Sequence, residues 1–290
     1  MKLPAFDYAA PATLAEAVAL LARHNGDALP LAGGQSLIPM LAFRMASPSL
    51  LVDLRNVPDL DAIAISNEGV SLGARVRWCD IAADARIAKA HPLLAAAVAC
   101  IAHYQIRNRG TVGGSLAHAD LAAELPGIAV TCDANIVAVG PTGTCVIKAA
   151  DFFLGPLMTA LQAGELVVEL RLPAWPSQRR WAFEEFARQR GGFAMAGIAL
   201  YYDERDGIVC DAHIGVFGAT SRLQRIASAE AAVNGRVIDE STITLASQAA
   251  AHAVDPVDDA DASAAYRRAL VATLVQRALK ASAVRKVGTS

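Results

Sequence analysis

Two glycine pairs constrain the fold of this chain more than any other sequence feature. The first lies in the string LPLAGGQSLIPM at residues 29–40 and the second in RNRGTVGGSLAHAD at residues 107–120. Consecutive glycines tolerate a positive φ and carry no Cβ, so their N–H groups can point into one concavity. Such concavities bind anions, phosphate above all. The two pairs therefore predict two loops that converge on one diphosphate, although either pair alone is also typical of an ordinary turn.

Polar side chains beside the glycines favour the same interpretation. Ser36, Thr111 and Ser115 supply hydroxyl donors, and Arg107 and Arg109 precede the second pair closely enough to offset the charge of a phosphate. Neither segment matches G-x-G-x-x-G or G-x-x-x-x-G-K followed by Ser or Thr. A classical Rossmann fold or P-loop is therefore disfavoured.

Apolar periodicity and turn residues divide the first part of the chain into two units. Residues 1–55 read as a small βαβ-like unit, in which Thr13 and Glu16 form a capping-box pattern before a helix. Its strands are expected at 29–32 and 50–54. The second unit is expected to begin with strands at 61–65 and 70–74, followed by helices at 80–90, 93–103 and 120–131. A hairpin at 135–148 and a closing strand at 166–172 are expected to complete it.

The segment LPAWPSQRR at residues 172–180 has two prolines and is the best boundary in the sequence. Beyond it we expect strands at 181–188, 196–203 and 208–217, and helices at 222–233, 240–252 and 261–282. Three strands followed by three helices predict an α+β unit. The expected domains are therefore 1–175, with subdomains 1–55 and 56–175, and 178–290.

The composition argues against nucleic acids, metals and membranes as direct ligands. The net charge is only −2, without a basic block, and the five cysteines and six histidines form no metal-binding pattern. The longest apolar run, at 93–102, is far shorter than the about eighteen residues of a membrane span. The N-terminus does not resemble a signal peptide. We therefore expect a soluble, cytoplasmic protein without a metal site.

Whole strings are more specific than the glycines they contain. AGGQSLIPML, then LVDLRNVPDL, then RNRGTVGGSLAHADLAAELP resemble the FAD-binding medium subunit of the molybdenum hydroxylases. The resemblance covers essentially the whole chain. It implies an α+β fold similar to the vanillyl-alcohol-oxidase/MurB (PCMH) type, with FAD held between two subdomains. A C-terminal domain of a three-stranded sheet and helices would follow.

The resemblance also implies which residues contact FAD. Glu124 falls where relatives carry an acidic residue against the flavin nucleotide, whereas Asp120 is more typical of a helix N-cap. Phe193 corresponds to an aromatic cover of the isoalloxazine ring, with a plain core residue as the alternative, and Gly192 stands where the family often has Asp. The diphosphate is expected to contact Ala32, Gly33, Gly34, Gln35, Ser36, Leu37, Thr111, Val112, Gly113, Gly114 and Ser115.

For function, the resemblance implies an electron relay without catalytic residues in this chain. A large molybdopterin-binding subunit oxidises the substrate, a small subunit with two 2Fe–2S clusters carries the electrons, and the FAD passes them to an external acceptor. A mean hydropathy of +0.35 favours partner-covered surfaces, as in a dimer of heterotrimers. The sequence most resembles medium subunits that serve N-heteroaromatic hydroxylases. A self-contained flavin oxidase and a cofactor-free scaffold remain as alternatives.

Overall fold

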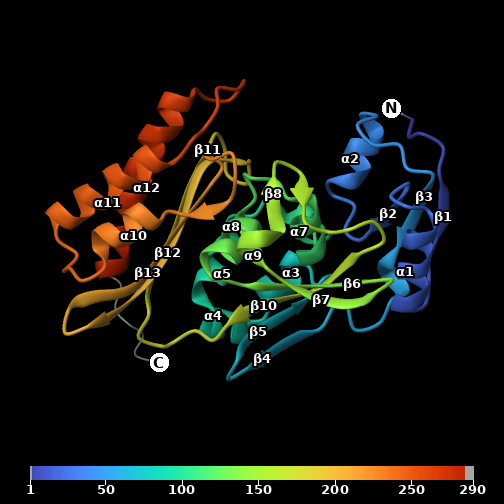
Figure 1. Ribbon diagram of the computed structural model, residues 1–290, viewed down its shortest axis with the longest axis horizontal. Coiled ribbons are helices and arrows are strands. Elements are labelled where there is room, and N and C mark those ends of the chain that lie inside the picture. The colour runs from blue at the N-terminus through green and yellow to red at the C-terminus, as the bar shows by residue number, and fades with distance from the viewer. Residues whose placement is uncertain (1, 285–290) are drawn as a thin grey trace.

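The computed structural model describes residues 2–284, which form three sheets in series from the N-terminal to the C-terminal end (Figure 1). The N-terminal unit is a parallel three-stranded sheet of order β1-β3-β2. Its elements are β1 Asp7–Ala9, α1 Leu14–Arg23, β2 Ala28–Leu31, α2 Leu37–Ala42 and β3 Leu50–Asp53. Helix α1 buries Ala17, Val18 and Leu21 on one face, as its apolar spacing requires. The expected βαβ-like unit is therefore confirmed.

The central unit is an antiparallel sheet with helices on one side. Its strand order is β4-β5-β10-β6-β7, from β4 Ile63–Ser66, β5 Gly69–Gly73, β10 Leu166–Pro173, β6 Asn135–Gly140 and β7 Gly143–Lys148. The helices are α3 Trp78–Ala83, α4 Ala85–Ala90, α5 Pro92–Cys100, α6 Tyr104–Arg107, α7 Val112–His118, α8 Glu124–Thr131 and α9 Ala149–Phe152. A small hairpin, β8 Phe153–Gly155 with β9 Met158–Thr159, follows α9. The hairpin and the closing strand are as predicted.

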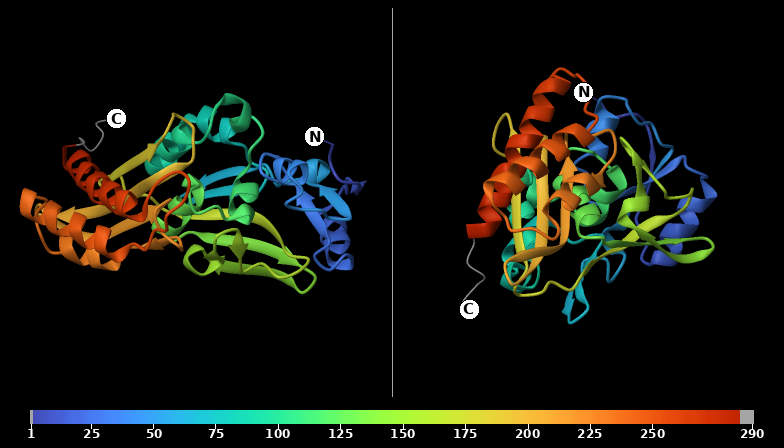
Figure 2. Two further views of the ribbon diagram at one scale, coloured as in Figure 1. Left: turned by 90° about the horizontal axis from the view of Figure 1, so that it is seen from above. Right: turned by 60° about the vertical axis from the view of Figure 1, so that its left-hand side comes forward.

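The C-terminal unit is a four-stranded antiparallel sheet whose two faces are both covered (Figure 2). Its strands are β11 Arg180–Ala187, β12 Ala194–Arg205, β13 Ile208–Phe217 and β14 Gln224–Arg225. Helices α10 Ala227–Val233, α11 Glu240–Ala253 and α12 Ala264–Val284 cover one face, and α5 and α8 contact the other. On β12, Ile198 and Leu200 pack against the C-terminal helices, while Ala199 and Tyr201 pack against the core of the central unit. The sheet thus joins the C-terminal helices to the central unit.

The linker between these two sheets is anchored by aromatic and charged contacts. The Trp175 ring lies 4.5 Å from the His91 ring and 5.2 Å from the Tyr201 ring, measured between centroids. The Arg179 guanidinium lies 4.3 Å from the Tyr201 ring centroid, and its Nη2 donates to Asp203 Oδ2 at 2.8 Å. Such cation–π and ion-pair contacts hold the segment in one place.

Several predicted helices are shorter than the sequence suggests. The helix expected at 80–90 is divided at Asp84, which ends α3, caps α4 and accepts a hydrogen bond from the Arg86 N–H at 3.0 Å. The helix expected from Asp120 begins at Glu124 after the N-cap Ala123. Asp120 instead accepts from the Ala122 N–H at 2.8 Å in the preceding turn, so its expected N-cap role is wrong.

Two further expectations need correction. The Thr13 side chain accepts from the Glu16 N–H at 3.2 Å, but the Glu16 carboxylate accepts from the Ala12 N–H rather than from Thr13. The capping box is therefore only half formed. The expected helix at 222–233 begins with the short edge strand β14 in place of its first turn, which makes the C-terminal sheet four-stranded rather than three-stranded.

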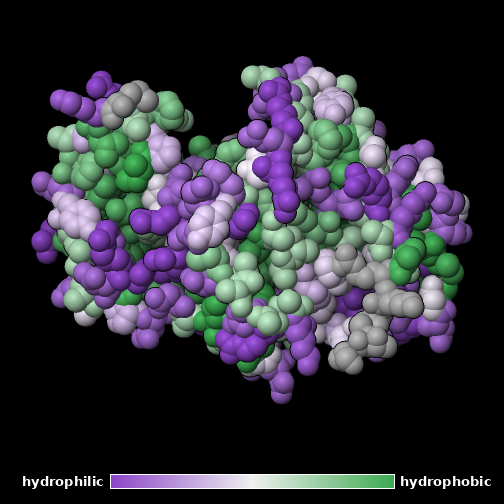
Figure 3. All heavy atoms as spheres, turned by 180° about the vertical axis from the view of Figure 1, so that it is seen from behind, coloured by the Kyte–Doolittle hydropathy of each residue, from purple (hydrophilic) through white to green (hydrophobic). Residues whose placement is uncertain are grey.

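Hydrophobic side chains are not confined to the interior. Large exposed ones occur just after α2, on the β8–β9 hairpin, at the start of α6 and before β12, namely Phe43, Met45, Leu154, Leu157, Met158, Tyr104 and Phe193. Figure 3 shows the face opposite to that of Figure 1, where hydrophobic residues gather in the middle between hydrophilic ones. Within residues 2–284, no helix combines the length and the apolar character that a membrane crossing requires.

Candidate functional site

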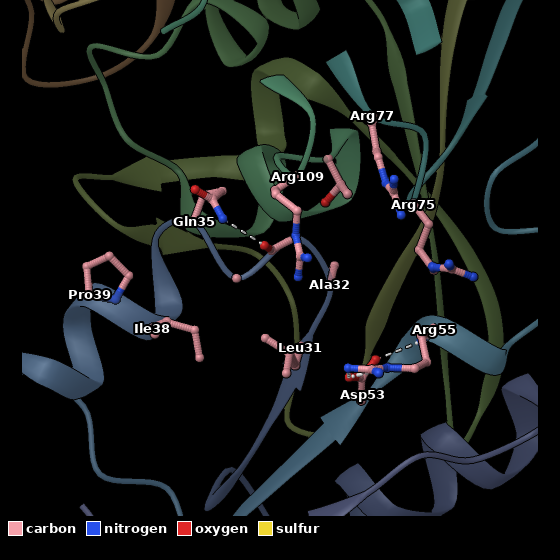
Figure 4. Close-up of a pocket in the computed structure, with 13 residues that line it drawn as sticks. Leu31, Ala32, Gln35, Ile38, Pro39, Asp53, Arg55, Arg75, Arg77 and Arg109 are labelled. Atoms are coloured by element: carbon pink, nitrogen blue, oxygen red, sulfur yellow. Dashed lines mark hydrogen bonds and ion pairs between the residues drawn. The ribbon is translucent and has the colours of Figure 1, made fainter. Parts of the chain in front are cut away.

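A cavity of about 640 Å³ lies between the N-terminal unit and the central unit. The N-terminal unit contributes the end of β2, the following loop, the start of α2 and the end of β3. The central unit contributes the segments before α3 and before α7. The lining residues are Leu31, Ala32, Gly33, Gly34, Gln35, Ile38, Pro39, Asp53, Arg55, Arg75, Arg77, Arg109 and Thr111 (Figure 4).

The first glycine segment forms a true loop between β2 and α2. Gly34 has a φ of +71°, a conformation that favours glycine, and the Gln35 side chain donates to the Gly33 carbonyl at 3.1 Å. Ala32, Gly33, Gly34 and Gln35 all line the cavity. Ser36 is the N-cap residue of α2, but its side chain does not cap the helix.

The second glycine segment is not a loop, which corrects the expectation for it. Thr111 is the N-cap of α7, its Oγ1 accepts from the Gly114 N–H at 3.3 Å, and both Gly113 and Gly114 lie in the first helical turn with negative φ. Gly113 is needed for packing, because a Cβ there would lie 2.5 Å from the Ala74 Cβ. The positive-φ argument therefore holds for Gly34 and fails for this pair.

The two segments meet at Gly33. A Cβ on this residue would lie 2.1 Å from the Arg109 carbonyl oxygen, far inside van der Waals contact. Only glycine lets the loop after β2 approach the segment that leads into α7 this closely. The convergence that the sequence predicted is therefore present in the structure.

The cavity wall is strongly basic. Four guanidinium groups, from Arg55, Arg75, Arg77 and Arg109, line it together with one carboxylate, Asp53. Figure 4 shows Arg75 and Arg77 beside each other on one side, with Ile38 and Pro39 on the other. Within residues 2–284, only Arg55 of these four forms an ion pair, so the other three charges are free to bind an anion.

Asp53 fixes the orientation of Arg55 at the end of β3. Its carboxylate is 4 % exposed and accepts from the Arg55 Nε at 2.8 Å, the Arg55 N–H at 2.9 Å and the Tyr8 hydroxyl at 2.8 Å. Burial raises the pKa of Asp53, but these hydrogen bonds outweigh it, and the pKa lies below its usual value. Asp53 is thus ionised at neutral pH.

Arg107 does not take the part that its sequence position suggests. Its Nη1 donates to the carbonyl oxygens of Ile101 and Ala102, both at 2.9 Å, and it does not line the cavity. Of the two arginines that precede the second glycine pair, only Arg109 is placed to offset the charge of a phosphate.

The remaining predicted site residues lie outside the cavity wall. Leu37, Val112, Gly113, Gly114 and Ser115 continue the two segments into α2 and α7. Glu124 is buried at the start of α8, and burial, followed by the charges of Glu185 and Asp120, raises its pKa to about 8. Phe193 directly precedes β12 and is 74 % exposed, so the alternative of a plain core residue is wrong.

Sequence reasoning missed the part of the cavity that comes from distant segments, namely Asp53, Arg55, Arg75 and Arg77. One signal was present: Asp53 and Arg55 follow a buried apolar strand, and Arg75 and Arg77 alternate directly after another. Charged side chains at the end of a strand lie next to the loops, where binding residues are commonly found.

The fold places a cavity with a basic wall between two units of mixed helix and strand. The family described as FAD binding domain in molybdopterin dehydrogenase matches residues 4–175, and CO dehydrogenase flavoprotein C-terminal domain matches residues 181–282. The chain belongs to this family, as a FAD-binding medium subunit of the molybdenum hydroxylases, and is part of an oxidoreductase.

Relatives match along nearly the full length. The nicotine 6-hydroxylase medium subunit of Paenarthrobacter nicotinovorans is 39 % identical, over 96 % of this chain and 98 % of the relative. The structure of quinoline 2-oxidoreductase from Pseudomonas putida 86 is similar with a TM-score of 0.93 and 39 % identity, covering 98 % of each chain. Carbon monoxide dehydrogenase from Hydrogenophaga pseudoflava gives a TM-score of 0.94 and 36 % identity, over 97 % of this chain and 98 % of the other.

Proposed function

We propose that the FAD diphosphate lies between the loop after β2 and the start of α7, in contact with the cavity. The observation that carries this proposal is the basic wall, in which three arginines without an ion pair face two glycine segments in contact at Gly33. A diphosphate bears two negative charges or more, and charge-assisted hydrogen bonds from guanidinium groups suit it. Thr111, Gln35 and the N–H groups of the two segments would complete its coordination.

The isoalloxazine ring is proposed to lie on the other side of the two segments, toward Glu124 and Phe193. Phe193 is exposed, as a side chain must be if it is to cover a bound ring. Glu124 would contact the flavin nucleotide from the start of α8. The cavity with its arginines would then hold the adenosine diphosphate half.

FAD, when bound, supplies the redox chemistry, since it accepts electrons and releases them to an external acceptor. The chain itself binds the cofactor, orients it and sets the charge around it. Arg109 and Arg77 neutralise the diphosphate, and Asp53 holds the Arg55 guanidinium at the cavity rim. Electrons would arrive from 2Fe–2S clusters of a small partner subunit, because the described cysteines are dispersed and unpaired.

The substrate would be oxidised on a large molybdopterin-binding subunit. Relatives named for nicotine and quinoline support an N-heteroaromatic substrate for the complex.

The exposed hydrophobic residues just after α2 and on the β8–β9 hairpin support burial by partner subunits in a dimer of heterotrimers. We place this complex in the cytoplasm and divide the chain into domains 1–175, with subdomains 1–55 and 56–175, and 178–290.

The experiment is co-purification from the native host, with metal and flavin analysis, followed by stopped-flow reduction of the flavin. We expect molybdenum, iron and FAD in one complex, and rapid flavin reduction by an N-heteroaromatic substrate only when the iron–sulfur subunit is present. Rapid reduction of the isolated chain by an organic substrate would favour a self-contained flavin oxidase. A colourless chain that takes up no FAD would favour the scaffold.

A further inference from the structure

Two acidic side chains meet at the contact between the central unit and the C-terminal sheet. Glu124 is the first residue of α8 and is 9 % exposed. Its carboxyl group forms no ion pair with another residue in the range 2–284, and it accepts a hydrogen bond from its own backbone N–H. Glu185 lies on β11, and its Oε2 atom is buried without a hydrogen-bond partner among the same residues. A buried carboxyl oxygen without a partner is costly, so its retention at Glu185 calls for an explanation.

The alternation of side chains along β11 places Glu185 on the side of Glu124. Phe183, two residues before it, stacks on Phe217 at 5.7 Å between centroids and packs against the core of the central unit. Glu184 points the other way and forms an ion pair with Arg277 of α12 at 2.9 Å. Glu185 therefore faces α5 and α8 rather than the C-terminal helices.

Cys100 lies at the end of α5, which packs against both α8, where Glu124 lies, and β11, where Glu185 lies. Burial raises the pKa of its thiol to about 11, and the charges of Glu185 and Glu124 both add to this effect, against Arg190. Asp120, from the turn before α8, also acts on Glu124. Glu185, Glu124 and, more weakly, Glu184 thus all act on one thiol at this contact between the units.

The same contact carries the residue proposed to cover the flavin. Phe193 ends the loop between β11 and β12, and this loop packs against the chain just beyond Cys100. Gly191 has a φ of +76°, and a Cβ there would lie 2.5 Å from the Ala102 carbonyl oxygen. The loop that holds Phe193 and the acidic pair are therefore parts of one surface.

We propose that Glu124 binds FAD as a neutral carboxylic acid that donates a hydrogen bond, and that Glu185 is the positioning residue that keeps Glu124 in this form. The proposal rests on the FAD site proposed above and adds to it a protonation state. An ionised carboxylate accepts hydrogen bonds only, whereas a protonated one has an O–H donor. A neutral Glu124 also avoids placing a buried negative charge beside a cofactor that gains negative charge on reduction.

The direction of the pH dependence follows from the pKa of Glu124. Burial raises it, the Glu185 and Asp120 charges add to this effect, and together they bring it to about 8. Below this value Glu124 is protonated and donates, and above it the group is charged and lacks the donor. FAD affinity should therefore be constant at lower pH and fall above the pKa, by roughly tenfold per pH unit if only the protonated form binds.

The test is the dissociation constant of FAD for the full chain, measured by flavin fluorescence across this pH range. We expect the break near the pKa of Glu124 in the unmodified chain and a flat profile in Glu124→Gln, whose amide does not titrate. Glu185→Gln removes a negative neighbour, which lowers the pKa of Glu124, and so moves the break to lower pH. Glu184→Gln is the matched control, and its break should stay in place because Glu184 faces Arg277.

A second measurement does not depend on FAD. Infrared spectra of the chain without cofactor should show the carbonyl band of a protonated carboxyl group at neutral pH, and Glu124→Gln should lose it. Tight FAD binding with the same pH profile in the unmodified chain and in Glu124→Gln would overturn the protonated state of Glu124 but leave the proposed FAD site intact. Equal shifts in Glu185→Gln and Glu184→Gln would overturn the role of Glu185. A chain that binds no FAD at any pH would overturn the FAD site itself.

Discussion

The two glycine pairs share a sequence pattern but differ in structure. Gly33 and Gly34 lie in a loop after a parallel strand, where one permits close backbone contact and the other adopts a positive φ. Gly113 and Gly114 lie in the first turn of α7, where the absence of a side chain at Gly113 lets the helix pack on Ala74. The first pair therefore shapes the cavity directly, whereas the second places a helix start beside it. The Gly-Gly sequence alone does not distinguish a glycine pair in a loop from one in a helix.

The largest expected effect comes from Gly33→Ala, which breaks the contact between the two segments. The new Cβ would lie 2.1 Å from the Arg109 carbonyl oxygen, so the backbone must move. Overpacking of this kind costs about 3 kcal/mol, which corresponds to a roughly 100-fold loss of FAD affinity. Gly155→Ala is the control, since a Cβ there meets nothing within 4 Å. Equal FAD affinity in both variants would show that the close approach is not required.

Gly114→Val tests the helix start and should have a smaller effect. Its Cβ would lie 2.8 Å from the Thr111 Oγ1, the atom that caps α7. Loss of an N-cap costs about 1.4 kcal/mol, and we expect roughly tenfold weaker FAD binding with the fold retained. Calorimetric titration with FAD, beside thermal unfolding, measures both. Unchanged affinity with a displaced Thr111 would mean that the start of α7 does not contact the cofactor.

Part of this architecture could be predicted from the sequence and part could not. Apolar periodicity located the long strands of all three units, because strands with buried faces leave a local signal, but it missed the short strands β1, β8, β9 and β14. Helix α7 was missed because two glycines have low helix propensity, which packing of Gly113 on Ala74 overrides. The basic wall was missed because Arg55, Arg75 and Arg77 meet Arg109 only through the fold. The charged pairs after two strands were visible in the sequence, but their convergence on Arg109 was not.

The smallest expected effect separates two arginines that precede the second pair. Arg109→Gln removes a charge from the cavity wall, and we expect FAD affinity to fall about fivefold and to depend less on salt. Arg107→Gln removes donors to the Ile101 and Ala102 carbonyl oxygens instead. It should lower thermal stability and leave the salt dependence of FAD binding as it is. Identical salt profiles in the two variants would contradict the assignment of Arg109 to the site.

The most direct test of the account is a side-by-side measurement of FAD and FMN affinity for the purified chain. Two segments in contact at Gly33, faced by four arginines, form one site for a diphosphate with its adenosine. FMN has a single phosphate and lacks the adenosine half, so it should bind at least about 100-fold more weakly than FAD, a difference of about 3 kcal/mol. Acid release of the bound cofactor should yield FAD. Equal affinity for FMN and FAD would contradict the claim that the two glycine segments build a single diphosphate site.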